Sequence, residues 1–179
     1  KVAAIIAGLC SYASAFYTSE YDQQPMELGQ PISDLGFIDK GELIVGIFWG
    51  VISKEGADNL QTCVGDLKDE GAMVEDAWVK LHKGPLHFAA GLHELYEAVR
   101  DIPSVIGDCR IIHDDIQTLE AWIANLEAQD DLEAYIKHNV ERHLLALTND
   151  LRKARSEYAA EEYWQCGVEL GNMLVIATQ

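Results

Sequence analysis

The stretch FIDKGELIVGIFWGVI (residues 37–52) decides the fold of this chain. Its apolar side chains recur at the spacing of one helical face, at Leu43, Ile44, Ile47, Phe48 and Val51. Apolar residues also fill most of the remaining positions, and a helix that is apolar on nearly all sides lies inside a core. The apolar run of ten residues is too short to cross a bilayer. The stretch therefore predicts a central, buried helix.

Amphipathic stretches follow this central helix and are separated by short breaks. We expect further helices over residues 58–81, 86–101, 104–126, 131–154 and 157–176. Gly84-Pro85 and Pro103 are predicted to end helices, because proline lacks the N–H that a helix interior needs. No stretch alternates as a strand does. The pattern predicts an all-α fold, an antiparallel bundle of about five to six helices with an extended N-terminal arm.

The first fifteen residues, KVAAIIAGLCSYASA, have the layout of a secretory signal peptide. A lysine precedes an apolar run, and small residues end it as A-x-A. The alternative is a buried N-terminal helix of the mature protein. The predicted organisation is thus a signal peptide over 1–15, an arm over 16–36 and a helical bundle domain over 37–179. The expected location is outside the cell or in the secretory lumen, or alternatively in another oxidising lumen or at an organelle surface.

The arm over residues 16–36 contains prolines and glycines and shows no helical periodicity. Its apolar side chains, among them Phe16, Tyr17 and Tyr21, favour burial against another surface. We therefore expect these three residues to take part in association, either with a neighbouring copy or with the arm's own bundle.

The chain carries a net charge of −17, from 30 acidic and 13 basic residues. This charge repels phosphate backbones and anionic lipids, and no run of Lys or Arg offsets it. Nucleic-acid and membrane-surface binding are therefore not expected. The acidity favours solubility, and divalent cations at the acidic faces are the alternative interpretation.

The four cysteines, Cys10, Cys63, Cys109 and Cys166, form no C-x-x-C pair and have no histidine at zinc-ligand spacing. Cys63 and Cys109 each lie inside a predicted helical stretch, and in an oxidising compartment they are the natural disulfide pair. Cys166 then has Cys10 as a second partner, or it is free, or it is joined to another chain. Cleavage after Ala15 would leave it without a partner in its own chain.

Two glycine pairs stand at helical spacing, Gly46-x-x-x-Gly50 and Gly167-x-x-x-Gly171. Glycine costs about 1 kcal/mol in a helix interior relative to alanine, so four of them predict close approach between helices. That approach can lie within the bundle or between chains, and we assign these four glycines to association.

No arrangement for catalysis or metal binding is found. There is no H-E-x-x-H, no E-x-x-H pair, no EF-hand loop, no G-x-S-x-G and no phosphate-binding glycine loop. His82, His87 and His93 flank one predicted helix break, and solvent-facing histidines are favoured over a metal site. We predict no catalytic residue, no metal and no cofactor.

One set of short motifs occurs in a fixed order. These motifs are Phe37 with Gly46 and Gly50, Leu60-x-x-Cys63-x-x-Asp66, Gly91 ahead of Ile102-Pro103 and Asp108-Cys109, and Tyr163-Trp164-x-x-Gly167-x-x-x-Gly171. The order resembles a family of small secreted, cysteine-containing helical proteins of ciliates and other protists. The resemblance implies secretion, a helical fold and a Cys63–Cys109 bridge, and it implies no catalytic residue. Cys166 departs from the small residue usual before that glycine, which leaves its partner open.

These features favour a secreted, non-enzymatic helical protein that acts by self-association or by binding a partner protein. The alternative is a carrier of a small apolar ligand or pigment in the bundle core. Six aromatic residues could line such a pocket, although core packing is the favoured interpretation: Phe48, Trp49, Trp78, Trp122, Tyr163 and Trp164. An enzyme of unrecognised type is the third hypothesis.

Overall fold

A computed structural model describes residues 31–52, 68–106 and 113–179 of the chain. Within these ranges the chain forms six α-helices, two short 3-10 helices and no strand, so the predicted all-α class is confirmed. The α-helices are α2 (Phe37–Ile52), α3 (Lys68–His82), α4 (Phe88–Ile106), α5 (His113–Glu127), α6 (Leu132–Ala159) and α7 (Tyr163–Ala177). The 3-10 helices are η1 (Ile32–Asp34) and η2 (Pro85–His87).

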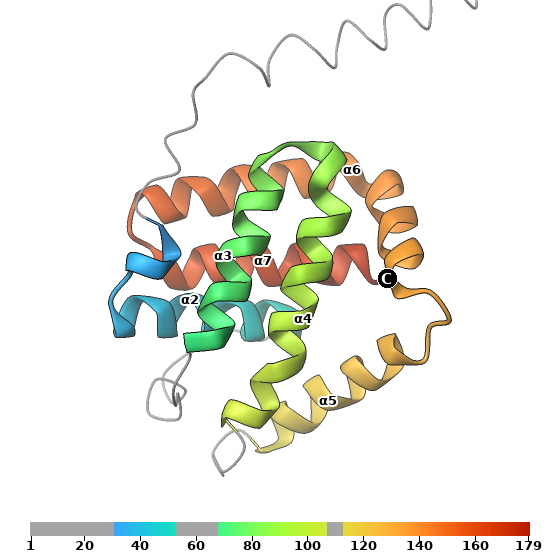
Figure 1. Cartoon of the computed structure of the whole chain (residues 1–179), viewed down its shortest axis with the longest axis horizontal. Helices are drawn as coiled ribbons and strands as arrows, with labels where there is room; N and C mark the ends of the chain where they lie inside the picture. Colours follow the sequence, from blue (N-terminus) through green and yellow to red (C-terminus); the bar gives the residue numbers. More distant parts are fainter. Residues whose placement is uncertain (1–30, 53–67, 107–112) are drawn as a thin grey trace, which may run out of the picture.

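The helices form two layers and an outlying helix (Figure 1). In one layer α7 lies between α2 and α6, and the α3–α4 hairpin crosses this layer. The α5 helix lies at one end of the molecule and contacts α2 and α4. Neighbours in sequence, α3 with α4 and α6 with α7, pair as antiparallel hairpins, as a bundle with short connections requires.

The α2–α7 pair runs parallel instead (Figure 1). Gly46 faces Gly167, and Gly50, one turn further along α2, faces Gly171, one turn further along α7. Because α3 to α6 lie between these helices in the sequence, no short turn forces them to be antiparallel. The helical bundle is therefore antiparallel in its hairpins and parallel at its centre.

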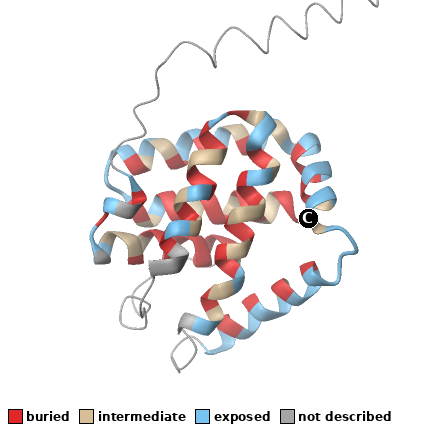
Figure 2. Cartoon of the chain, viewed as in Figure 1, coloured by how far each residue is buried: buried red, intermediate tan, exposed pale blue. Residues whose placement is uncertain are grey.

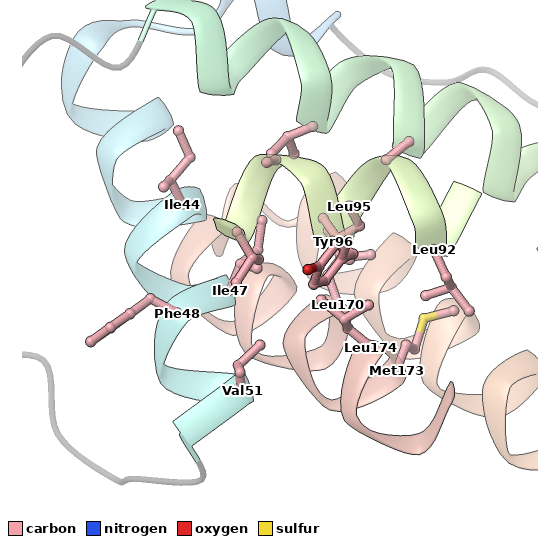
Figure 3. Packing of buried hydrophobic residues seen from close by; sticks show 14 of the residues in the cluster. Ile44, Ile47, Phe48, Val51, Leu92, Leu95, Tyr96, Leu170, Met173 and Leu174 are labelled. Atoms are coloured by element: carbon pink, nitrogen blue, oxygen red, sulfur yellow. The ribbon is translucent and has the colours of Figure 1, made fainter. Parts of the chain in front are cut away.

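The core lies where α2, α4 and α7 meet. Figure 3 shows Ile47 of α2, Leu95 and Tyr96 of α4, and Leu170 and Leu174 of α7 in this region. Every residue of α2 from 43 to 51 is buried, which confirms the expected central helix. The α6 helix instead buries one stripe and exposes the rest (Figure 2). Its second half follows a kink at His143, whose φ of −114° and ψ of 19° are not helical.

Two boundaries differ from those expected. Pro103 lies inside α4, which continues to Ile106 although proline has no N–H to donate to the carbonyl four residues earlier. The break expected near residue 155 lies instead at 160–162, because α6 continues to Ala159. Glu161 makes that turn at a φ of 61°, a left-handed conformation in which glycine or asparagine is the usual residue.

The end of the predicted arm is not extended. Residues 31–36 contain η1, which packs against α3, and the side chains of Ile32 and Leu35 are buried in the core. These two apolar residues are three positions apart, so one short turn buries both. Phe16, Tyr17, Tyr21 and residues 1–30 as a whole lie outside the described residues.

Candidate functional site

The four glycines assigned to association form the crossing of α2 and α7 within one chain. A methyl group on Gly46 would lie 3.0 Å from the Cα of Gly167, and one on Gly171 would lie 2.8 Å from the Cα of Gly50. Each would also overlap a backbone carbonyl of the facing helix, so the two backbones are in direct contact. The close approach is intramolecular, which is one of the two alternatives that the glycine spacing left open, and a role of these glycines in association between chains stays a prediction.

Cys166 is a buried, free thiol on α7, and Cys10, its expected partner in a second disulfide, lies outside the described residues. Burial raises the pKa of the Cys166 thiol, and the charges of Glu157 and Glu169 raise it further. A thiol with a raised pKa stays protonated at neutral pH and is a poor nucleophile. Cys166 therefore serves as a small apolar residue of the core.

Cys10, Cys63 and Cys109 lie outside the described residues, so their pairing stays a prediction. The contacts between α3 and α4 nevertheless show which residues of the two helices lie opposite each other. Leu81 packs against Gly91, and Lys80 pairs with Glu94 one turn further along. The first residues of α3 and the last residues of α4 therefore lie at the same end of one antiparallel hairpin.

A chain of aromatic and polar side chains joins α3, α6 and α7. The ring of His82 lies 4.1 Å from that of Trp78, Trp78 lies 5.0 Å from Tyr158, and Tyr158 lies 5.4 Å from Tyr163, between centroids. The Nδ1 atom of His82 is 2.7 Å from the carbonyl oxygen of Trp78 and donates a hydrogen bond to it. This cluster therefore joins the α3–α4 hairpin to the layer that contains α6 and α7.

The environment of His82 keeps its ring neutral. Burial lowers the pKa of His82 from 6.5 to about 4; the hydrogen bond to Trp78 opposes this shift and the positive charge of Arg155 adds to it. Burial likewise raises the pKa of Tyr158. Both groups are therefore held in their neutral forms at pH 7, as structural members of a core rather than as an acid and a base.

The three histidines that flank the helix break do not act together. His82 is buried, His87 is exposed on η2 and His93 is half-buried on α4. Across residues 31–52, 68–106 and 113–179, no group of three or more His, Cys, Asp or Glu side chains is placed to hold a metal ion. Nor does any helix in these ranges have the length and hydropathy that a membrane crossing needs.

The six aromatic residues fall into three groups of neighbouring rings. Trp49 lies beside Phe48 and Trp164, at 5.6 and 6.4 Å between ring centroids. Trp78 belongs to the His82 cluster through Tyr158, and Trp122 of α5 lies 6.1 Å from Tyr96 of α4. These rings therefore join different helix pairs.

Three large apolar side chains are exposed in the described ranges, and their exposure was not predicted from the sequence. They are Ile38 on α2, Leu86 on η2 and Leu145 on α6, with 69%, 93% and 76% of their surface accessible. Leu145 lies beside the buried stripe of α6, in a Leu-Leu-Ala-Leu run. In such a run the helical period alone does not decide which leucine is buried and which is exposed. Exposed side chains of this size are available for contact with another molecule.

The comparisons place the chain in a family. Residues 21–178 match the Secreted protein B-like (SctB-like) family, and the chain belongs to it. No curated protein and no solved structure matches the chain. The family description supports the expectation of a secreted protein.

Proposed function

We propose that this member of the Secreted protein B-like family is a secreted, non-enzymatic protein that acts by association, with itself or with a partner protein. The observation that carries the proposal is the exposure of Ile38, Leu86 and Leu145 on a domain whose other large apolar side chains are at least partly buried in the described ranges. Covering such side chains removes apolar surface from water and favours association.

The state of the buried titratable groups supports a non-enzymatic role. His82 and Cys166 are residue types that catalyse reactions in other proteins, and here burial keeps the ring neutral and the thiol protonated. Catalytic groups are commonly tuned toward the working pH, whereas these two are shifted away from it. Their contacts are those of core residues.

We further propose that Cys63 and Cys109 form a disulfide that closes the open end of the α3–α4 hairpin. Counting eighteen residues back from Leu81 reaches Cys63, and counting eighteen forward from its contact Gly91 reaches Cys109. This equal spacing from one contact between the two antiparallel helices supports the pairing. Such a bridge would contribute about 4 kcal/mol by the chain-entropy estimate.

Non-reducing peptide mapping of the secreted protein tests this bridge. A linked peptide pair containing Cys63 and Cys109 is expected, and its mass should separate on reduction. Cys63 and Cys109 recovered as free thiols, or paired with other cysteines, would refute the bridge.

Sedimentation velocity tests the association. We compare the whole chain with a chain that lacks residues 1–30 and with the variant Ile38→Ser, Leu86→Ser, Leu145→Ser. Removal stops at residue 30 because Ile32 and Leu35 belong to the core. We expect the whole chain to associate and both altered chains to do so less.

The control is Leu86→Met, which keeps the exposed apolar surface and should leave association unchanged. A whole chain that stays monomeric at low and high salt, and that binds no partner from the medium in which it is secreted, would contradict the proposal.

A further inference from the structure

The acidic charge of the chain is not spread evenly over its helices. The 28 residues of α6 contain five of the 13 Lys and Arg residues, Lys137, Arg142, Arg152, Lys153 and Arg155. They contain four acidic residues, Glu133, Glu141, Asp150 and Glu157, so α6 carries a net charge of +1 in a chain of net charge −17. This uneven distribution is hard to see in the sequence, because these cations are spaced along a helix and form no run.

Several cations of α6 point to solvent without an acidic partner. Lys153 is an exception, because its Nζ atom lies 3.6 Å from the Oδ1 atom of Asp150 and 3.5 Å from the Oε1 atom of Glu169. Lys137, Arg142 and Arg152 are exposed and form no ion pair with any residue in the part of the chain that the structure describes. They are therefore available to an acidic partner.

The exposed Leu145 lies among these cations. Arg152 follows it by seven residues, a spacing that keeps the two near one side of the second half of α6, and Arg142 precedes it by three residues, just before the kink at His143. All three are exposed. We call Arg142, Leu145 and Arg152 the α6 face: an apolar centre with a positive charge on each side.

The α5 helix has the opposite character. Residues 111–136 contain seven acidic residues and no Lys or Arg. Glu120, Ala124 and Glu127 are exposed and recur at helical spacing, so a small apolar residue stands between two negative charges. We call these three residues the α5 face.

The two helices lie on opposite sides of the molecule, with the second half of α6 at one edge of the view and α5 at the other (Figure 1). One molecule therefore cannot pair its own α5 face with its own α6 face. A second copy can supply the missing partner for each.

We propose that the α6 face of one copy docks on the α5 face of the next, with Arg142 and Arg152 against Glu120 and Glu127 and with Leu145 against Ala124. This inference rests on the proposed self-association and names its surfaces. Because the two faces differ and lie apart, the contact joins copies head to tail and builds rings or open chains rather than a two-fold dimer.

Salt separates this contact from other modes of association. Attraction between the two faces is screened as the Debye length falls to about 8 Å at physiological ionic strength, so it weakens in salt. Association driven by an apolar arm has no such attraction to lose, so salt, which screens the repulsion between copies of net charge −17 in either case, strengthens it.

Charge exchange tests the pairing directly. One variant carries Arg142→Glu and Arg152→Glu, and the other carries Glu120→Lys and Glu127→Lys. Each variant alone presents like charges on both faces, so its apparent dissociation constant for self-association should rise by about tenfold or more. An equimolar mixture of the two variants should associate again, because each then meets the opposite charge.

The matched control reverses two exposed cations elsewhere, Lys83→Glu and Arg100→Glu on the α3–α4 hairpin, and should associate like the wild type. Circular dichroism verifies that each variant is folded, and Arg142→Gln with Arg152→Gln serves as a milder pair. Sedimentation velocity at 20 mM and 300 mM salt reads the outcome.

Two outcomes overturn the inference in different ways. A wild type that associates while the charge variants behave like it, alone and mixed, refutes the two faces and leaves self-association standing. A wild type that is monomeric under every condition refutes both. Association restored only in the mixture supports the inference, since no contact through an unrelated surface predicts it.

Discussion

The crossing of α2 and α7 makes a sharp prediction for Gly46→Ala. The new methyl group would lie 3.0 Å from the Cα of Gly167 and overlap the carbonyl oxygen of Trp164, both of them backbone atoms that cannot rotate away. Ordinary contacts of such a group begin near 3.4 Å, so the two helices must move apart. The movement would loosen the packing of Leu43 and Ile47 against α7.

The magnitude follows from two opposing effects. Overpacking a tight core costs about 3 kcal/mol, and alanine gains about 1 kcal/mol over glycine in helix propensity. We therefore expect the free energy of unfolding to fall by about 2 kcal/mol. For a domain of this size that corresponds to a lowering of the Tm by roughly 4 to 8 °C.

Gly71→Ala is the matched control. Gly71 lies in α3, and a methyl group there would meet only the Cδ of Lys40 at 3.7 Å, an ordinary contact with a flexible side chain. Here alanine adds helix propensity without overpacking, so the free energy of unfolding should rise by about 0.5 to 1 kcal/mol. Urea denaturation followed by circular dichroism measures both variants.

Combining Gly46→Ala with Gly167→Ala tests the crossing itself. Both substitutions act on one contact, so the second should cost less once the first has separated the helices, and the two effects should not add. The reasoning is refuted if Gly46→Ala is as stable as the wild type, or if it moves in the same direction as Gly71→Ala.

Three further predictions concern buried polar groups. Asn139 is 2% exposed and its Nδ2 donates to the carbonyl oxygen of Ala177 at 3.2 Å, so Asn139→Ala should lower the free energy of unfolding by about 1 to 2 kcal/mol. Thermal denaturation measures this change in stability. An unchanged stability would mean that the hydrogen bond from Asn139 to the end of α7 does not stabilise the fold. His82 is protonated near pH 6.5 in the unfolded chain but only near pH 4 in the folded one. Stability should therefore fall as the pH drops through this window, by at most about 1.4 kcal/mol per pH unit, and His82→Gln should flatten that slope in denaturation curves taken at each pH. Because burial raises the pKa of its thiol, Cys166 should react with iodoacetamide only after unfolding, and rapid labelling of the native protein, read by mass, would contradict its burial.

Local pattern was enough to predict several elements. The bounds of α2 agree with those expected from the 37–52 stretch, because a helix apolar on all sides has few alternatives to the centre of a core. The α5 helix was expected in part, since its buried residues Ile116, Leu119 and Ile123 recur at helical spacing. The end of α6 was not predicted. The left-handed turn that follows this helix is made by Glu161 rather than by glycine, so the sequence contains no usual signal for a helix end there.

The sequence by itself determined that this is an acidic, all-helical chain with one central helix and four glycines suited to close packing. It left open whether the glycines meet within the chain, which way α2 runs against α7, and where the charges of α5 and α6 lie in space. Only the tertiary structure decided these points. The physical reason is that residue spacing reports which side of a helix is apolar, whereas the identity and direction of the neighbour depend on how distant segments pack together.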